Sequence, residues 1–183
     1  IVARVGGARV IAPSGRSVDM AIDGGGYVAM VDREAFDPWL RERAEAAGAR
    51  RYELAFEALE REPDGLVTVI CGPRRNEGPR VRIRARAVIG ADGANSAVAR
   101  SALGPAARVP FVFAYHEVIR APVGATASYD DRRCDIYYQR PYSPDFYAWV
   151  FPHGPTASVG TGSMHKGFAL REAVGRLRSE IGL

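Results

Sequence analysis

The chain has 183 residues and a formal net charge of +4, and 47% of its residues are hydrophobic. This size suits one ordinary domain or two small lobes, and no apolar run approaches the roughly 20 residues that a membrane-spanning helix needs. Cys71 and Cys134 are too far apart in sequence for a CxxC site, which argues against a zinc site and against a disulfide framework.

The beginning of the chain predicts short strands separated by turns. We expect strands over 2–22 with turns at 13–15 and 23–26, and then a strand over 27–31. The chain begins at Ile1 inside a strand-like stretch, with neither a start methionine nor a signal-peptide pattern. We therefore expect it to be an internal segment of a longer protein.

A helix is predicted next. Apolar side chains recur there at helical spacing and share one face: Phe36, Leu40, Ala44 and Ala47. Asp32 and Asp37 are both candidate caps. Pro38 fits best in a first turn that starts after Asp37, because a proline there gives up no needed hydrogen bond, and Gly48 suits the end of the helix.

Two strands, 52–59 and 66–71, are expected to form a hairpin around a turn at 63–65. The next strand, 80–89, alternates arginines with apolar residues, so the arginines share one face: Arg80, Arg82, Arg84 and Arg86. Such a row could bind nucleic acid, and this alternative stays open. A solvent-facing strand is favoured, because no aromatic residues interleave to stack on bases.

The chain becomes fully apolar at 87–89, where we expect a buried strand, and continues as Gly-Ala-Asp-Gly-Ala-Asn-Ser at 90–96, a segment that we call the glycine turn. A short helix follows, to Leu103. Glycines let the backbone approach a phosphate-bearing ligand closely, and a helix N-terminus favours its negative charge. Asp92 is then an acceptor for a hydroxyl or a water. On residue types alone, a capped strand-to-helix turn without a ligand explains the segment equally well.

The second half predicts a mostly antiparallel sheet with a closing helix. Runs rich in aromatic and β-branched residues give the strands: 111–119, 133–139, 146–151 and 156–161. The helix over 168–181 has one apolar face. Gly160-Thr161-Gly162 lacks the third glycine of a dinucleotide fingerprint, and the three histidines have no metal-ligand spacing, so no metal is predicted. The fold class is mixed α/β (α+β).

Three segments of the chain carry a resemblance to one protein family. GADGANSAVAR at 90–100 resembles the second flavin motif of the hydroxylase-like flavoprotein fold, and the segment from Val31 to Leu40 resembles the helix that precedes that motif. YAWVFP at 147–152, followed by SVGTG at 158–162, resembles the YxWxFP signature of the geranylgeranyl reductases. The segments 113–117 and 134–138 are similar to the branch of that family from chlorophyll and bacteriochlorophyll synthesis.

The resemblance implies an arrangement of domains and sites. Residues 1–104 would be part of an FAD/NAD(P)-binding three-layer domain with inserted strands, and 105–183 an incomplete substrate domain. The implied FAD contacts are Arg33, Phe56, Glu57, Asp92, Gly93 and Ser96. The implied walls of an apolar slot for an isoprenoid tail are Tyr147, Trp149 and Phe151. Without the resemblance, alternating rings alone predict packing within a core strand, and Arg33 is a surface residue.

The resemblance also implies a function. The parent protein would reduce the geranylgeranyl group of geranylgeranyl diphosphate or of geranylgeranyl-(bacterio)chlorophyll to phytyl, with FAD and NADPH as cofactors. The family's GxGxxG turn and its Gly-Asp segment are not in this sequence, so the segment alone is expected to be inactive. We expect a cytoplasmic protein with peripheral contact to the photosynthetic membrane and no nucleic-acid partner. A related FAD-dependent hydroxylase and a non-catalytic isoprenoid- or pigment-binding module remain alternatives, and the sequence names no proton donor.

Overall fold

A computed structural model describes residues 1–74, 78–104, 110–126 and 128–183. The chain forms two compact units, one made of 1–41 with 112–183 and the other of 42–111. The boundaries of these units differ from the predicted division at residue 104, because strands from the beginning of the chain join the sheet of the second half. The assignment of 1–104 to the flavin and of 105–183 to the substrate stays a prediction, since compactness does not identify a ligand.

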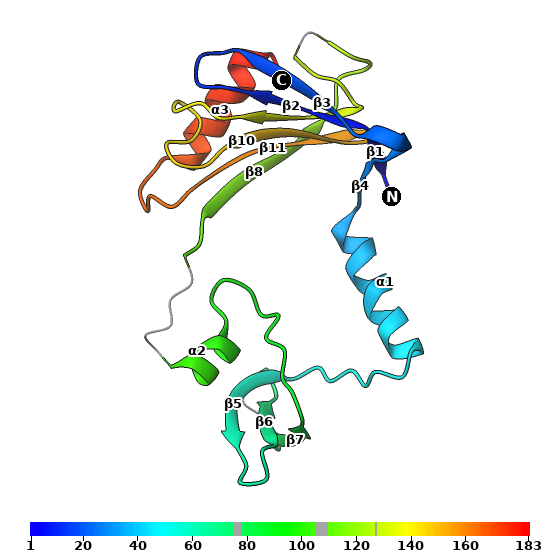
Figure 1. The fold of residues 1–183 in the computed structure, drawn as a ribbon, viewed down its shortest axis with the longest axis vertical. Helices are drawn as coiled ribbons and strands as arrows, with labels where there is room; N and C mark the ends of the chain where they lie inside the picture. The colour runs from blue at the N-terminus through cyan, green and yellow to red at the C-terminus, as the bar shows by residue number, and fades with distance from the viewer. Residues whose placement is uncertain (75–77, 105–109, 127) are drawn as a thin grey trace. The chain divides into compact units, whose positions relative to one another are not determined.

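The first unit is built on a six-stranded sheet with the order β3-β2-β9-β10-β11-β8 (Figure 1). Neighbouring strands are antiparallel, except that β2 and β9 run parallel. The strands are β2 (Gly7–Ile11), β3 (Ser17–Ala21), β8 (Phe113–Arg120), β9 (Arg133–Tyr137), β10 (Ala148–His153) and β11 (Thr156–Ser163). The mostly antiparallel sheet predicted for the second half is confirmed, and two strands from the beginning of the chain extend it.

The core of this unit lies between the sheet and helix α3 (Leu170–Ile181), which crosses one face of the sheet (Figure 1). Val174 and Leu177 of α3 are fully buried, as is Val159 of β11. Arg178 of α3 also forms an ion pair with Glu117 of β8, with an N–O distance of 2.5 Å. Because α3 covers only one face, alternate residues of the strands point to a second face, which we call the uncovered face because no described residue of α3 lies on it.

A small ribbon and a helix complete the first unit. β1 (Ala3–Val5) pairs with β4 (Val28–Met30), and a short 3-10 helix (Asp23–Gly25) precedes β4. Helix α1 (Arg33–Ala46) then begins and runs across the boundary between the units.

One of the two candidate caps of this helix is confirmed, but the predicted place of Pro38 in its first turn is wrong. Asp32, not Asp37, caps it, because the amide of Glu34 donates to Asp32 Oδ1 at 2.9 Å. Pro38 therefore lies inside α1, where it removes one hydrogen bond of the helix. The favourable cap at Asp32 outweighs the preference of proline for a first turn.

The second unit holds a three-stranded antiparallel sheet and a short helix. The elements are β5 (Ala55–Arg61), β6 (Val67–Gly72), β7 (Val81–Ala85) and α2 (Ala97–Leu103). The amide of Leu59 in β5 donates to the hydroxyl of Ser101 in α2 at 3.2 Å, which ties the sheet to the helix. The predicted hairpin and the helix ending at Leu103 are confirmed.

The apolar run before the glycine turn does not form the predicted buried strand. β7 ends at Ala85, residues 87–90 have no regular structure, and the side chain of Ile89 is 90% exposed. Continuous apolar runs are typical of strands in parallel sheets that are buried on both faces. Among the described residues, no strand pairs with this run.

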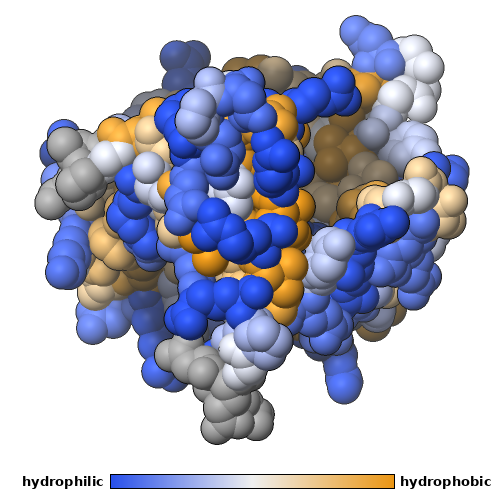
Figure 2. Space-filling view, turned by 90° about the horizontal axis from the view of Figure 1, so that it is seen from below, coloured by the Kyte–Doolittle hydropathy of each residue, from blue (hydrophilic) through white to orange (hydrophobic). Residues whose placement is uncertain are grey.

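The surface carries many apolar side chains. Figure 2 shows orange apolar residues reaching the surface between blue hydrophilic ones on the face that it presents. Val18 and Met20 of β3 and Val118 of β8 are each more than half exposed. In the part of the chain that the structure describes, no helix has the length and apolar character that a membrane crossing needs.

Candidate functional site

The uncovered face of the six-stranded sheet carries a row of aromatic rings. Along β10, Ala148, Val150 and Pro152 are buried and alternate with the half-buried Trp149 and Phe151. The row, which we call the aromatic row, consists of Phe146, Tyr147, Trp149 and Phe151. Consecutive ring centroids are 4.1, 6.0 and 5.9 Å apart, distances at which aromatic rings attract one another.

The three ring-bearing residues predicted for the substrate slot are therefore brought together. Tyr147, Trp149 and Phe151 lie neither in the packed core nor free in solvent, because each is half-buried. A half-buried apolar surface gains free energy when a further apolar group covers it. The row can thus serve as one wall of an apolar binding site.

Two glycines of β11 make room for the row. Gly160 lies directly across from Trp149, and a Cβ atom added to it would be 2.6 Å from Trp149 Cε2 and 2.7 Å from the Cβ of His116. A Cβ on Gly162 would be 2.9 Å from Cδ1 of Phe146. Such separations are well below ordinary carbon contacts of about 3.5–4.0 Å. The GxG of β11 is therefore needed for the rings to lie close over the strand.

The loop before the row is held by two polar side chains that sequence reasoning missed. The hydroxyl of Ser143 is buried, donates to the carbonyl of Gly162 at 2.8 Å and accepts from the amide of Phe146 at 2.8 Å. The Asp145 carboxylate accepts from the hydroxyl of Ser163 at 2.6 Å and from the amide of Met164 at 2.8 Å, and the first of these bonds keeps the pKa of Asp145 low. The Ser-Pro-Asp sequence at 143–145 is typical of a turn and could have indicated these two side chains.

A cavity of about 650 Å³ lies in the first unit beside the row. We call it the histidine cavity, and its polar lining residues are Asp32, Arg33, Glu34, His116, His153, Thr156 and Ser158. Val118 and Val31 supply apolar walls. Of the predicted flavin contacts, Arg33 is the one that lies here.

Arg33 is already engaged with its own helix. Its Nε and Nη2 donate to the two oxygens of Asp37 at 2.6 and 2.8 Å, a bidentate pair. These bonds raise the pKa of Arg33 and lower the pKa of Asp37. The side chain of Arg33 is 75% exposed, so an additional partner can still approach its guanidinium.

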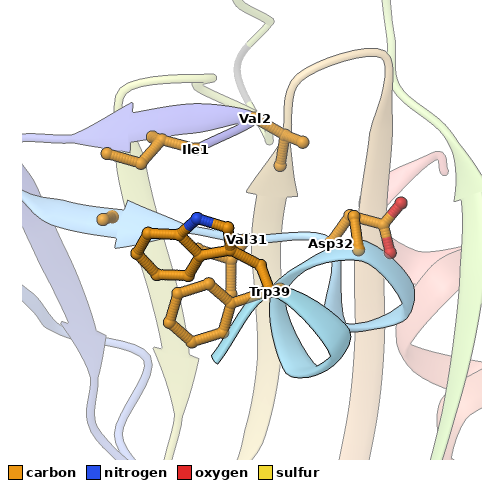
Figure 3. Close-up of a pocket in the computed structure, with 8 residues that line it drawn as sticks. Ile1, Val2, Val31, Asp32 and Trp39 are labelled. Carbon is orange, nitrogen blue, oxygen red and sulfur yellow. The ribbon is translucent and has the colours of Figure 1, made fainter. Parts of the chain in front are cut away.

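A second, more apolar pocket of about 790 Å³ lies at the beginning of α1. Figure 3 shows the ring of Trp39 turned toward Ile1 and Val31, whereas the carboxylate of Asp32 points away from them. Phe36 stacks on Trp39 with ring centroids 5.6 Å apart. No sequence pattern indicates this apolar pocket, because its lining comes from three separate short segments.

The glycine turn lies in the second unit and is organised by Asp92. One carboxylate oxygen accepts from the hydroxyl of Ser96, and the other accepts from the amides of Ala97 and Val98 at 2.7 and 3.1 Å. Ser96 in turn caps α2 by accepting from the amide of Ala99 at 2.9 Å. The bond from Ser96, followed by the amide of Val98, lowers the pKa of Asp92.

These bonds change the role expected of the helix N-terminus. The amides of the first turn of α2 already donate to Asp92 and Ser96, so in this arrangement they are not free to hold a phosphate. Gly93, with φ at +80°, has open space where a side chain would be. The close approach to a ligand that the sequence predicted is thus possible at Gly93.

The remaining predicted flavin contacts lie on β5. Phe56 is half-buried and precedes a bulge, and the carboxylate of the exposed Glu57 forms an ion pair with Arg80 at 2.6 Å. Arg82 pairs with Glu60, and Arg84 pairs with Asp64 at 2.5 Å. The arginine face of this sheet is exposed, as predicted for a solvent-facing strand, and three of its cations are neutralised by neighbouring carboxylates.

The predicted site residues therefore fall into two sets. Arg33 belongs to the first unit together with the aromatic row, whereas Phe56, Glu57, Asp92, Gly93 and Ser96 belong to the second. Within the described ranges, no three His, Cys, Asp or Glu side chains gather in a way that could hold a metal ion.

Comparison with known proteins identifies relatives. The chain is 48% identical over its full length to the geranylgeranyl diphosphate reductase of Rhodobacter capsulatus, of which it covers 45%. It is 38% identical to the chloroplastic geranylgeranyl diphosphate reductase of Arabidopsis thaliana, with 90% of this chain and 36% of the relative covered. The chain thus spans less than half the length of these curated relatives.

A solved structure from Thermoplasma acidophilum, described as geranylgeranyl bacteriochlorophyll reductase-like, has the same fold. It superimposes with a TM-score of 0.77 at 28% identity, over 98% of this chain and 46% of that one. Together with the curated relatives, it confirms the resemblance drawn from the sequence and the mixed α/β fold class. The family model of the FAD binding domain matches residues 5–129. Because that match covers more than half of the chain, this chain belongs to the FAD-binding domain family.

Proposed function

We propose that the full-length protein is a flavin-dependent reductase that hydrogenates the geranylgeranyl group of geranylgeranyl diphosphate, or of geranylgeranyl-(bacterio)chlorophyll, to phytyl with NADPH as the electron source. One observation carries the proposal: the aromatic row is half-buried on the uncovered face of the sheet, over Gly160 and Gly162. The relatives named as geranylgeranyl reductases support the choice of an isoprenoid substrate.

The row suits a polyprenyl tail. Such a tail is a chain of flat alkene units without hydrogen-bonding groups, so a site for it needs apolar walls and few polar atoms. Trp149 has its indole N–H bonded within the protein, to Ser158 at 3.1 Å, so its polar atom does not face a ligand unsatisfied. The row then presents ring surfaces of Phe146, Tyr147, Trp149 and Phe151 to the substrate.

Residues of the second unit leave room for a bound FAD. The open space at Gly93 allows a dinucleotide to approach the backbone, and Asp92 fixes the turn that presents it. The exposed guanidinium of Arg33 is a further candidate contact. When bound and reduced, the flavin supplies a hydride equivalent, which is the redox step that side chains do not perform. The chain's own contribution is to hold cofactor and tail and to exclude water.

The row has a second role in this proposal. Reduction of an unactivated alkene develops cationic character on a tertiary carbon if a proton arrives with or ahead of the hydride. The faces of Trp149 and Tyr147 can stabilise that charge, by about 0.5–2 kcal/mol for a cation–π contact. This interaction is made only in the transition state and therefore accelerates the chemical step.

The test is a reduction assay on the full-length protein with NADPH and each of the two acceptors in separate reactions. We expect products whose masses increase by added hydrogen, with and without O2. Trp149→Leu keeps an apolar wall but removes the strong ring face, and it should lower turnover by about 2- to 30-fold. Trp39→Leu, in the apolar pocket, is the matched control and should leave turnover unchanged.

Other outcomes would overturn the proposal. Oxygen-dependent insertion of oxygen would identify a hydroxylase. Tight binding of a geranylgeranyl lipid by flavin-loaded protein without any reduction would identify a binding module. Salt-sensitive binding of nucleic acid by the arginine face, without reduction of either acceptor, would point to the nucleic-acid alternative.

The cellular location follows from the substrate in this proposal. A lipidic acceptor, and above all a chlorophyll ester, places the enzyme in the cytoplasm with peripheral contact to the photosynthetic membrane. Exposed apolar side chains such as Val18 and Met20 are available for that contact. Flotation of the full-length protein with lipid vesicles should show reversible binding, and its complete absence would contradict membrane contact.

A further inference from the structure

A hydrogen-bonded group of three side chains lies next to the aromatic row. Trp149 Nε1 donates to Ser158 Oγ at 3.1 Å, and His116 Nδ1 lies 3.0 Å from the same oxygen. The three residues come from adjacent strands, β10, β11 and β8. The sequence spacing of these residues does not predict the group, because it depends on the register of three strands.

The chemistry of the donors fixes what Ser158 does. An indole N–H can only donate, so Ser158 Oγ must accept from Trp149. The hydroxyl still has one proton and one further lone pair for His116. If Nδ1 carries a proton it donates to Ser158, and if it does not, the serine hydroxyl donates to Nδ1. The contact is therefore compatible with Nδ1 either carrying or lacking the proton.

The indole is confined from two further sides. Its ring lies over Gly160, where no side chain can fit, and the Cβ of His116 approaches the same spot from the opposite strand. Tyr147 and Phe151 flank it along the row. Packing over Gly160 sets the position of the ring, and the bond from Nε1 to Ser158 adds a polar contact that a flipped ring would lose.

We propose that Ser158 and His116 are positioning residues that hold the Trp149 indole in one orientation, and that this orientation aligns an isoprenoid double bond for reduction. The identity of the tail rests on the proposed function. The hydrogen-bonded arrangement of the indole does not, because it concerns the protein without substrate.

The first measurement is therefore independent of activity. Full-length protein labelled with fluorotryptophan gives a fluorine NMR signal for Trp149, which Trp149→Phe assigns by its loss. Ser158→Ala should shift and broaden this signal, because the ring gains a second orientation, and Ser158→Thr should restore it. Thr156→Val removes a hydroxyl from the same strand and the same cavity wall without touching Trp149, and it should leave the signal unchanged.

The link through His116 is tested by non-additivity. His116→Leu should perturb the Trp149 signal in the same direction as Ser158→Ala, and His116→Asn, which keeps a hydrogen-bonding atom near Nδ1, should perturb it less. In the Ser158→Ala background, His116→Leu should add little, since residues in one network do not act independently. An unchanged signal in Ser158→Ala, or full additivity of the two changes, would overturn the positioning role.

The kinetic measurement then addresses the reaction. Loss of one neutral hydrogen bond and of ring alignment should lower kcat of Ser158→Ala on the order of tenfold, with a smaller change in KM. A rise in KM alone would show that Ser158 serves binding and would overturn the alignment claim. If the wild-type protein reduces neither acceptor, the proposed function fails instead, and the fluorine signal still reports whether the group of three side chains exists.

Discussion

Gly160 is a position where the structure predicts that even one added methyl group would overlap its neighbours. A methyl group there would lie 2.6 Å from Trp149 Cε2 and 2.7 Å from the Cβ of His116. Carbon atoms rest at about 3.5–4.0 Å, so each contact is short by roughly 1 Å. The neighbours are an aromatic ring held by a hydrogen bond and a Cβ fixed to a strand, and neither can yield as the end of a flexible side chain would.

Gly160→Ala should therefore destabilise the protein by about 1–3 kcal/mol, the usual cost of overpacking. It should also displace the indole and break its bond to Ser158. The matched control is Gly175→Ala in α3, where an added Cβ meets nothing within 4 Å. Since glycine inside a helix is unfavourable, that change should stabilise by about 0.5–1 kcal/mol.

The assay is urea unfolding of the full-length variants, with the fluorine signal of Trp149 recorded in parallel. The same glycine-to-alanine change is then expected to act with opposite signs at the two positions. If Gly160→Ala were as stable as the wild type and left the Trp149 signal unchanged, the ring would not lie over β11, and the aromatic row would be wrong as described.

Three further predictions concern residues of the first unit. Leu177→Ala should cost about 2–5 kcal/mol of unfolding free energy, because the side chain is fully buried between α3 and the sheet; a cost below about 1 kcal/mol would contradict that packing. Hydrogen bonding from Arg178 lowers the pKa of Glu117, so this carboxylate stabilises the fold above the ordinary glutamate range and loses that contribution as the pH falls through its folded value. Glu117→Gln should accordingly lower the free energy of unfolding by up to about 1 kcal/mol at neutral pH. The difference between variant and wild type should disappear when unfolding is measured at acidic pH, and a difference that stays constant with pH would refute this reasoning. Burial raises the pKa of the Cys134 thiol to about 11, so a thiol reagent at pH 8 should modify it slowly in the native protein and rapidly after unfolding, and fast native modification would count against its burial.

The sequence predicted the elements whose patterns are local. The apolar face of α3 was visible in the spacing of Val174 and Leu177, and the alternation along β10 placed Trp149 and Phe151 on one side. The exposed arginine face of β7 followed from the same two-residue period. In each case one strand or helix alone decides which side chains are buried.

The failures came where structure depends on partners far away in the sequence. Residues 87–89 have the composition of a buried strand, yet no described strand pairs with them and Ile89 is exposed. The start of α1 depended on a choice between Asp32 and Asp37 that local propensity did not decide. The bonds that join Trp149 to Ser158 and His116 required the register of three strands, which no single-sequence pattern contains.

The most direct measurement is photolabelling of the full-length protein with a geranylgeranyl lipid that carries a photoreactive group along its tail. If the aromatic row is the wall of the isoprenoid site, the modified peptides should contain residues 146–151 or strand β8, which lies beyond β11 in the same sheet. Unlabelled geranylgeranyl diphosphate should compete. Labelling confined to the apolar pocket around Phe36 and Trp39, with the row unmodified, would contradict this assignment.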